Sequence, residues 1–279
     1  MIRFLIAESE TADQREQRRR ATGFSSAESF AATLTVIAPG AQCDIARPHE
    51  ADCTLPGPIG GYDGVFLSGS PLHVYDDKPE TRRQLDFMRA VFASGTPSFG
   101  SCAGLQVAVA AAGGDVAKAP RHEVAFARRI TATEAGRRHP LLAGRPATWD
   151  ALAIHSDSVT RLPAGATLLA GNQMCPIQAA EIRFAGGLFW GVQYHPELTL
   201  QEIAVAMRRQ SDDIIEQGLA RNEADVEAQA ARLQALGDDP ARDDLAWCLG
   251  VDAEITDPVL RHRELANFIE TQCRTKAAA

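Results

Sequence analysis

Short apolar runs alternate with amphipathic stretches in the N-terminal part of the chain, as far as Ala112. Three runs have the length of a buried strand: residues 2–6, 64–67 and 97–100. Helical spacing of apolar side chains follows each of them, in residues 25–37, 85–92 and 104–112. The polar residues 8–24 predict a loop after the first strand. Strands that alternate with helices predict an α/β fold in which helices cover both faces of a mostly parallel central sheet.

The pattern changes in the second half of the chain, where strand-like runs have little helix between them. These runs are residues 124–131, 149–154, 166–170, 177–182 and 188–194. They predict an antiparallel extension of the sheet. Thr199 and Glu202 form a capping-box pattern, and helical spacing follows, with breaks at Gly218, residues 237–240 and residues 257–258. We therefore expect a C-terminal helical appendage.

Charge divides the chain at about the same place. The 279 residues have a net charge of −8. Residues 1–200 hold 20 acidic and 19 basic residues, whereas residues 201–279 hold 16 acidic and 9 basic residues. We expect a domain of residues 1–200 and an acidic extension of residues 201–279, packed on that domain, on a partner or across a homodimer. The extension carries apolar positions that must be buried against something: Ile203, Met207, Ile214, Leu245, Trp247, Leu260, Leu265 and Phe268.

The charge pattern argues against nucleic acid or an anionic membrane as a partner, because both require a basic surface. The one dense basic cluster is interrupted by acids and predicts a solvated helix face. It consists of Arg15, Arg18, Arg19 and Arg20. No apolar run approaches the roughly 20 residues that span a bilayer. We expect a cytoplasmic protein without a membrane segment.

The six cysteines are scattered, with no Cys-x-x-Cys pair and no histidine at ligand spacing. This argues against a metal site, and the sequence predicts no cofactor. Cys102 differs from the others because it lies between a short strand and a helix, with glycine, serine and alanine around it. That setting is typical of a strained nucleophile elbow. Taken alone, a cysteine among alanines is better explained as a small buried apolar side chain.

Two motifs resemble those of a known family. The segment Gly-Ser-Cys-Ala-Gly-Leu-Gln at residues 100–106 is similar to the nucleophile motif of class I glutamine amidotransferases. The segment Gly-Val-Gln-Tyr-His-Pro-Glu at residues 191–197 is similar to the histidine motif of the same family. The resemblance covers roughly residues 1–200, and it is greatest to the domain that supplies ammonia in GMP synthases. It implies a flavodoxin-like fold.

The resemblance also implies a catalytic triad. Cys102 would be the nucleophile, His195 the general base and then acid, and Glu197 the carboxylate that orients the imidazole. The chemistry agrees, because a carboxamide needs a thiolate to attack it and an imidazolium to protonate the departing nitrogen. A carboxylate on the second ring nitrogen fixes the tautomer and stabilises the imidazolium.

The resemblance extends to binding residues. The loop Ser-Gly-Ser-Pro at residues 68–71 follows a buried strand at the place of the family's oxyanion loop. The backbone N–H groups of Gly69 and Ala103 would then hold the oxyanion. Gln106 would contact the substrate. The triplet His155, Ser156 and Asp157 resembles the family segment that binds the α-amino and α-carboxylate groups of glutamine, although it is also compatible with a plain loop after a strand.

Two positions depart from the family pattern. Ala103 is smaller than the residue that many relatives place after the nucleophile, and residues 121–125 lack the glycines usual around Glu123. Both departures lie at the rim of the site. They place the choice of substrate in doubt before they place catalysis in doubt.

Three functions remain open. The first is hydrolysis of glutamine through a γ-glutamyl thioester, with the ammonia passed to an ATP-dependent synthetase on another chain, because neither a P-loop nor a Ser-Gly-Gly-x-Asp-Ser pyrophosphatase loop occurs here. The second is a stand-alone γ-glutamyl hydrolase that acts on the amide of a small amine. The third is a non-catalytic binding or regulatory subunit.

Overall fold

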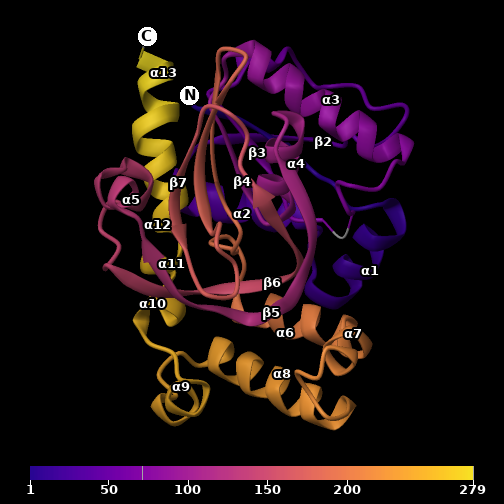
Figure 1. The fold of residues 1–279 in the computed structure, drawn as a ribbon, viewed down its shortest axis with the longest axis vertical. Coiled ribbons are helices and arrows are strands. Elements are labelled where there is room, and N and C mark those ends of the chain that lie inside the picture. The colour runs from indigo at the N-terminus through magenta and orange to yellow at the C-terminus, as the bar shows by residue number, and fades with distance from the viewer. Residues whose placement is uncertain (71, 279) are drawn as a thin grey trace.

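The computed structural model describes residues 1–70 and 72–278. Within them the strands form one nine-stranded sheet in the order β2-β1-β3-β4-β9-β8-β7-β5-β6 (Figure 1). The strands are β1 (Arg3–Ala7), β2 (Gln42–Ala46), β3 (Gly64–Leu67), β4 (Ser98–Ser101), β5 (Asp115–Ala132), β6 (Thr148–Arg161), β7 (Ala166–Gly171), β8 (Ala179–Phe184) and β9 (Gly187–Val192).

Pairing within the sheet changes direction at β9. The pairs from β2 through β1, β3 and β4 to β9 are parallel, and the pairs from β9 through β8, β7 and β5 to β6 are antiparallel. The predicted α/β fold with an antiparallel extension is confirmed. The antiparallel pairing expected for residues 188–194 holds on one side of β9, where it pairs with β8. On its other side Phe189 pairs in parallel with Ser98 of β4, so β9 is also the fifth parallel strand.

Helices cover both faces of the sheet. Those within residues 1–200 are α1 (Ala12–Thr22), α2 (Ser26–Ile37), α3 (Pro79–Ser94), α4 (Ala103–Ala111) and α5 (Glu134–Arg138), with short turns η1 (Ile59–Gly61) and η2 (Pro140–Leu142). Phe4 and Ile6 of β1 pack with α2, whereas Leu5 and Ala7 pack with α3 and α4. Successive strand residues thus face opposite layers, as a two-sided buried sheet requires.

The N-terminal prediction needs two corrections. Residues 8–24 contain helix α1 rather than a loop, because Thr11 and Gln14 form a capping box that apolar periodicity does not reveal. The basic residues of α1 are not a solvated face throughout. Arg15 is buried, and its side chain donates to the backbone oxygen of Glu10 at 2.7 Å. Arg18 donates to Glu202 at 3.0 Å, which joins α1 to the C-terminal helices.

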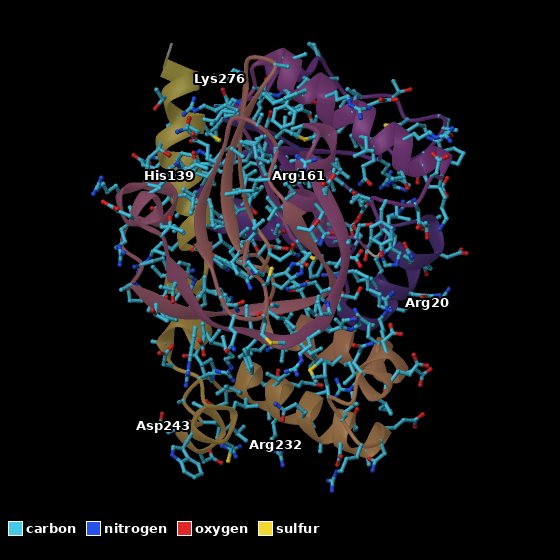
Figure 2. All side chains as sticks on the ribbon, in the orientation of Figure 1. Arg20, His139, Arg161, Arg232, Asp243 and Lys276 are labelled. Atoms are coloured by element: carbon cyan, nitrogen blue, oxygen red, sulfur yellow. The ribbon has the colours of Figure 1, made fainter. Side chains whose placement is uncertain are left out.

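The C-terminal extension is helical, as predicted. It forms α6 (Leu200–Arg209), α7 (Ser211–Glu216), α8 (Glu223–Asp238), α9 (Asp243–Leu249), α10 (Ala253–Thr256), α11 (Pro258–Arg261), α12 (Arg263–Phe268), the π-helical turn η3 (Ile269–Cys273) and α13 (Arg274–Ala278). Helices α6 to α8 pack against β5 and β6 around Leu152, Ile203 and Leu233. Polar side chains of α8 and α9, such as Arg232 and Asp243, point away from the sheet (Figure 2).

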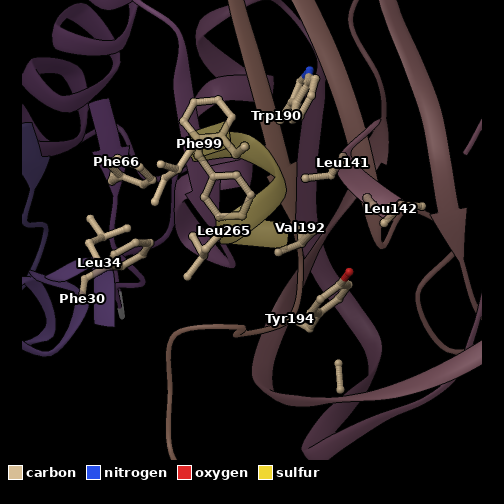
Figure 3. Packing of buried hydrophobic residues seen from close by; sticks show 14 of the residues in the cluster. Phe30, Leu34, Phe66, Phe99, Leu141, Leu142, Trp190, Val192, Tyr194 and Leu265 are labelled. Atoms are coloured by element: carbon tan, nitrogen blue, oxygen red, sulfur yellow. The ribbon is translucent and has the colours of Figure 1, made fainter. Parts of the chain in front are cut away.

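The end of the extension belongs to the main core. Leu265 of α12 lies among Phe66, Phe99 and Trp190 of the strands (Figure 3). Phe268 is fully buried in the same cluster, with its ring 5.6 Å from that of Phe99. Hydrophobic packing therefore crosses the boundary expected at residue 200. The net charge changes at this boundary, but residues on its two sides share one hydrophobic core.

One apolar residue of the extension is not packed as we expected. Trp247 on α9 is 84% exposed, because its helix presents Leu249 and not Trp247 to the core beneath α8. Trp149 and Trp190 are buried. Among the helices formed by residues 1–70 and 72–278, none has both the length and the apolar character needed to cross a membrane.

Candidate active site

Cys102 occupies a sharp turn between β4 and α4. Its backbone has φ 51° and ψ −111°, a strained conformation for a residue with a side chain. Its N–H donates to the backbone oxygen of Val192 at 2.8 Å, which ties the turn to β9. A Cβ added to Gly104 would lie 2.6 Å from the backbone oxygen of Leu67, so the helix approaches β3 as closely as glycine allows. The sulfur atom is thereby held at the carboxyl end of the parallel strands.

His195 and Glu197 follow the end of β9 and meet Cys102 there. The Nδ1 atom of His195 lies 2.8 Å from Oε1 of Glu197, and this oxygen also accepts from the hydroxyl of Ser101 at 2.8 Å. Cys102 lines the same pocket as His195 and Glu197, with its sulfur 4.0 Å from the backbone oxygen of Ile154. All three side chains of the predicted triad are nine-tenths or more buried. The structure therefore brings the three residues together from two strand ends.

The charges around His195 favour its protonated form. Burial lowers the pKa of the imidazole, but the Glu197 carboxylate and the Cys102 sulfur outweigh burial and raise that pKa to about 10. A proton held on His195 is available for donation to a leaving group. The arrangement can therefore supply both a nucleophile and a general acid.

The two residues predicted to supply oxyanion donors lie beside the triad. Gly69 lies beside His195, since a Cβ added to it would be 3.0 Å from Cε1 of the imidazole. The N–H of Ala103 is the first of α4 and points from the helix end that follows Cys102. Neither N–H has a hydrogen-bond partner among residues 1–70 and 72–278. The last residue of the predicted oxyanion loop, Pro71, lies outside the described residues.

The residues predicted to contact the substrate come from two elements, β6 and α4. His155, Ser156 and Asp157 form part of β6 and not a loop after a strand. A register shift in β5, between Lys118 and Glu123, makes the pairing with β6 irregular beside them. Gln106 donates to the backbone oxygen of Asp157 at 3.2 Å, so α4 and β6 support each other. All four predicted residues line one pocket with the triad.

The sequence did not point to the residues that hold Asp157. Its carboxylate lies 2.5 Å from Nδ1 of His73 and accepts from the hydroxyl of Tyr75 at 3.0 Å. The rings of His73 and Tyr75 stack with their centroids 5.2 Å apart. No motif marks these two residues, because they lie in an irregular segment before α3.

The pocket has a volume of about 310 Å³, and two walls of it were not predicted. Glu10, Gln14 and Arg18 line it from the segment after β1 and from α1. Residues of the C-terminal extension line it from α6 and α7: Ala206, Arg209, Gln210 and Asp213. Since these residues follow the boundary at 200, sequence motifs of the domain could not reveal them.

A second polar cluster lies beside the pocket. Glu123, His155 and Cys175 each direct one potential metal-ligand atom into a common space, with these atoms within 4.8 Å of one another. Spacing along the sequence indicates no ligand cluster among the histidines and cysteines, but three segments far apart in sequence bring these three residues together. Burial and the charge of Glu123 raise the pKa of the Cys175 thiol to about 12.

Comparison with known proteins identifies the family. The model of the family described as glutamine amidotransferase class-I matches residues 34–211. A γ-glutamyl-L-1-hydroxyisopropylamide hydrolase from a Pseudomonas species is 34% identical over 275 residues, covering 96% of this chain and 92% of that protein. A GMP synthase from Porphyromonas gingivalis is 34% identical over 208 residues, which cover 72% of this chain but 38% of the synthase.

Solved structures agree on the fold. A glutamine amidotransferase from Thermotoga maritima superposes with a TM-score of 0.63 at 14% identity and covers 98% of both chains. A glutamine amidotransferase from Methylobacillus flagellatus gives 0.59 at 18% identity and covers 99% of this chain and 95% of its own. The prediction of an enzyme is confirmed by the family and by the hydrolase relative. The chain belongs to the class I glutamine amidotransferase family of amidohydrolases.

Proposed function

We propose that this chain is a stand-alone hydrolase that cleaves a γ-glutamyl amide into glutamate and a small amine. The observation that carries the proposal is the wall that α6 and α7 add to the pocket, through Ala206, Arg209, Gln210 and Asp213. A site that only releases ammonia needs room for a carboxamide. A substituted amide also needs a surface for its amine part, and the chain supplies such a surface itself.

This wall is anchored to the body and is not a loose tail. The Glu202 carboxylate caps the start of α6 and also accepts from the Ser29 hydroxyl at 2.6 Å. It forms an ion pair with Arg18 of α1 at 3.0 Å. These contacts join α6 to α1 and α2 of the first domain. Fixed walls favour selection among amines by shape.

The comparisons support the same substrate class. The match to the Pseudomonas hydrolase covers 96% of this chain and so includes the extension, whereas the match to the GMP synthase covers 72% of it. The name of that hydrolase specifies an amide whose amine part is a hydroxyisopropyl group. A pocket of about 310 Å³ lies at the small end of the range for ligand sites, which suits glutamate joined to an amine of a few carbons.

The reaction would begin with attack on the amide. The Cys102 thiolate adds to the γ-carbonyl carbon, and the carbonyl oxygen becomes an oxyanion held by the N–H groups of Gly69 and Ala103. His195 then gives its proton to the amide nitrogen as the carbon–nitrogen bond breaks. The products of this half are a free amine and a γ-glutamyl thioester on Cys102.

Water would complete the cycle. The imidazole of His195, now neutral, takes a proton from a water molecule whose oxygen attacks the thioester. The same oxyanion donors stabilise the second tetrahedral intermediate, which collapses to glutamate and the Cys102 thiolate. Glu197 holds Nδ1 of His195 throughout, so that Nε2 stays directed at the reacting atoms.

A second candidate is glutaminase activity coupled to a synthetase on another chain. The 34% identity to the GMP synthase over 208 residues favours it. The third hypothesis, a non-catalytic subunit, has less support, because the cysteine, imidazole and carboxylate all line one pocket and the imidazole contacts the carboxylate at 2.8 Å.

The test is hydrolysis by the isolated chain. We expect glutamate release from γ-glutamyl alkylamides and hydroxyalkylamides at a higher kcat/KM than from glutamine. Glutamine as the best substrate, with a rate that rises on addition of a synthetase, would support the second candidate instead. No release from any γ-glutamyl compound by the folded chain would contradict both.

A further inference from the structure

We infer that Glu123, His155 and Cys175 form a binding site for a thiophilic divalent cation such as Zn²⁺. The three residues come from β5, from β6 and from the segment between β7 and β8. A carboxylate oxygen, an imidazole nitrogen and a thiol sulfur lie within 4.8 Å of one another. Zn²⁺ prefers this mixture of nitrogen, sulfur and oxygen ligands, and three protein ligands leave a fourth position for water. The inference does not depend on the proposed function.

The hydrogen bonds of His155 leave Nε2 as the ligand atom. Its Nδ1 lies 2.9 Å from the backbone oxygen of Asp157, an atom that only accepts, so Nδ1 carries a proton. Its Nε2 lies 2.9 Å from Oε2 of Glu123. With Nδ1 as the donor, Nε2 has a lone pair directed toward this carboxylate oxygen, and a cation placed between the two atoms would be bound by both.

Surrounding residues orient all three ligands. Asn172 donates to Oε1 of Glu123 at 2.6 Å and accepts from the N–H of Cys175 at 2.6 Å, so one side chain positions two ligands. Gln178 donates to Oε2 of Glu123 at 2.6 Å. The Nδ1–H of His155 is fixed by a backbone carbonyl, as is common for metal-bound histidines. A site prepared in this way needs little rearrangement to bind a metal.

The charges also balance. Zn²⁺ would bind the sulfur of Cys175 as a thiolate, and the thiol proton leaves to solvent. The Glu123 carboxylate and the new thiolate then neutralise the two positive charges of the ion. A neutral site is important because the ligands are 4%, 7% and 1% exposed, and a net charge at that depth would be costly.

Cavities on both sides give the ion a route in. His155 lines the pocket of about 310 Å³ that contains Cys102. Glu123 lines a separate cavity of about 610 Å³ between β5 and helices α7 and α8, together with His122 and Met207. The ligands are therefore buried but not sealed from small ions.

The test uses cobalt as a spectroscopic substitute for zinc, in the Cys102→Ala protein. This background removes the nucleophile, which could itself bind a soft metal. We expect one equivalent of Co²⁺ to give a thiolate-to-metal charge-transfer band together with the visible bands of a four-coordinate ion, and Zn²⁺ to displace it. Absence of the charge-transfer band in the folded Cys102→Ala protein would overturn the inference.

Two further variants in the same background identify the thiol. Adding Cys175→Ser should abolish the charge-transfer band, whereas adding Cys248→Ser should leave it unchanged, because Cys248 is exposed on α9. A band that survives Cys175→Ser overturns the inference. Circular dichroism establishes that each variant is folded.

A variant that keeps all three ligands provides a test that does not depend on the folding of Cys175→Ser. Asn172→Ala in the Cys102→Ala background removes only the side chain that positions Glu123 and Cys175. We expect the affinity for Co²⁺ to fall by about 10-fold or more, the usual effect of losing an orienting residue. Unchanged affinity would overturn the inference.

Discussion

The two parts of the chain on either side of residue 200 contribute different things to one pocket. The first part supplies the proposed reacting groups at the ends of β3, β4 and β9. The second part supplies α6 and α7, which line the pocket without adding a nucleophile or a base. Under the proposed function, substitutions in the first part should change the rate of the reaction, and substitutions in α6 and α7 should change the choice of amine.

The nucleophile should have the largest effect. Cys102→Ala removes the atom that would form the thioester, so we expect kcat/KM for any γ-glutamyl substrate to fall by about 10⁴-fold or more. Glutamate release measures it. Cys248→Ala, at an exposed thiol, is the matched control and should leave the rate unchanged. Equal activity of wild type and the folded Cys102→Ala protein would revive the non-catalytic hypothesis.

The next largest effect should be on the free energy of unfolding, for a buried residue of the extension. Phe268 is fully buried among the aromatic rings of the strands, and Phe268→Ala should lower the free energy of unfolding by about 3–5 kcal/mol. Trp247→Ala is the matched control, since Trp247 is 84% exposed and should change stability by less than about 0.5 kcal/mol. Urea unfolding measures both. Similar losses for the two variants would show that the end of the extension is not part of the core.

The carboxylate of the triad should have a smaller effect on rate and a distinct effect on pH dependence. Glu197→Gln should lower kcat/KM by about 100-fold, within the range for general acid–base groups. The Glu197 charge helps to raise the pKa of His195 to about 10, so wild type should lose its proton donor only as the pH rises through that value.

Removal of that charge lowers the pKa of the imidazole, so the alkaline limb of the kcat/KM profile should move to lower pH. A pH–rate profile of both proteins is the measurement. An alkaline limb that stays in place would mean that Glu197 does not act through His195.

The smallest change should be one of selectivity. Ala206→Leu adds bulk to the α6 wall without touching the triad, so we expect kcat/KM for alkylamides to fall about 10-fold relative to glutamine, similar to the effect of a methylene or two in an apolar pocket. Ala228→Leu on the exposed side of α8 is the control. Equal losses on glutamine and on alkylamides would argue that the wall does not contact the amine part.

The sheet and the triad could be predicted because short sequence patterns encode them. The motifs around Cys102 and His195 predict the triad, since the nucleophile turn and the strand end are each encoded in one short segment. Alternating apolar runs predict the sheet. Helix α1 was missed because its sequence is almost wholly polar and its stability depends on caps and on ion pairs such as that of Arg18 with Glu202.

The remaining features depend on contacts between distant segments. His73 meets Asp157 across 84 positions of sequence, and Glu123 meets Cys175 across the antiparallel strands. Ala206 of α6 and Cys102 line one pocket although they lie far apart in the sequence. Side chains that become neighbours through folding leave no spacing in the sequence from which to infer them.

The central claim is that the extension makes this site selective for a substituted amide. Competition in one reaction tests it most directly: the isolated chain receives equal concentrations of glutamine and γ-glutamyl isopropylamide, and the initial rates of ammonia and isopropylamine release are compared, which gives the ratio of the two kcat/KM values. The account predicts that amine release exceeds ammonia release by about 10-fold or more. Ammonia release equal to or faster than amine release would contradict it.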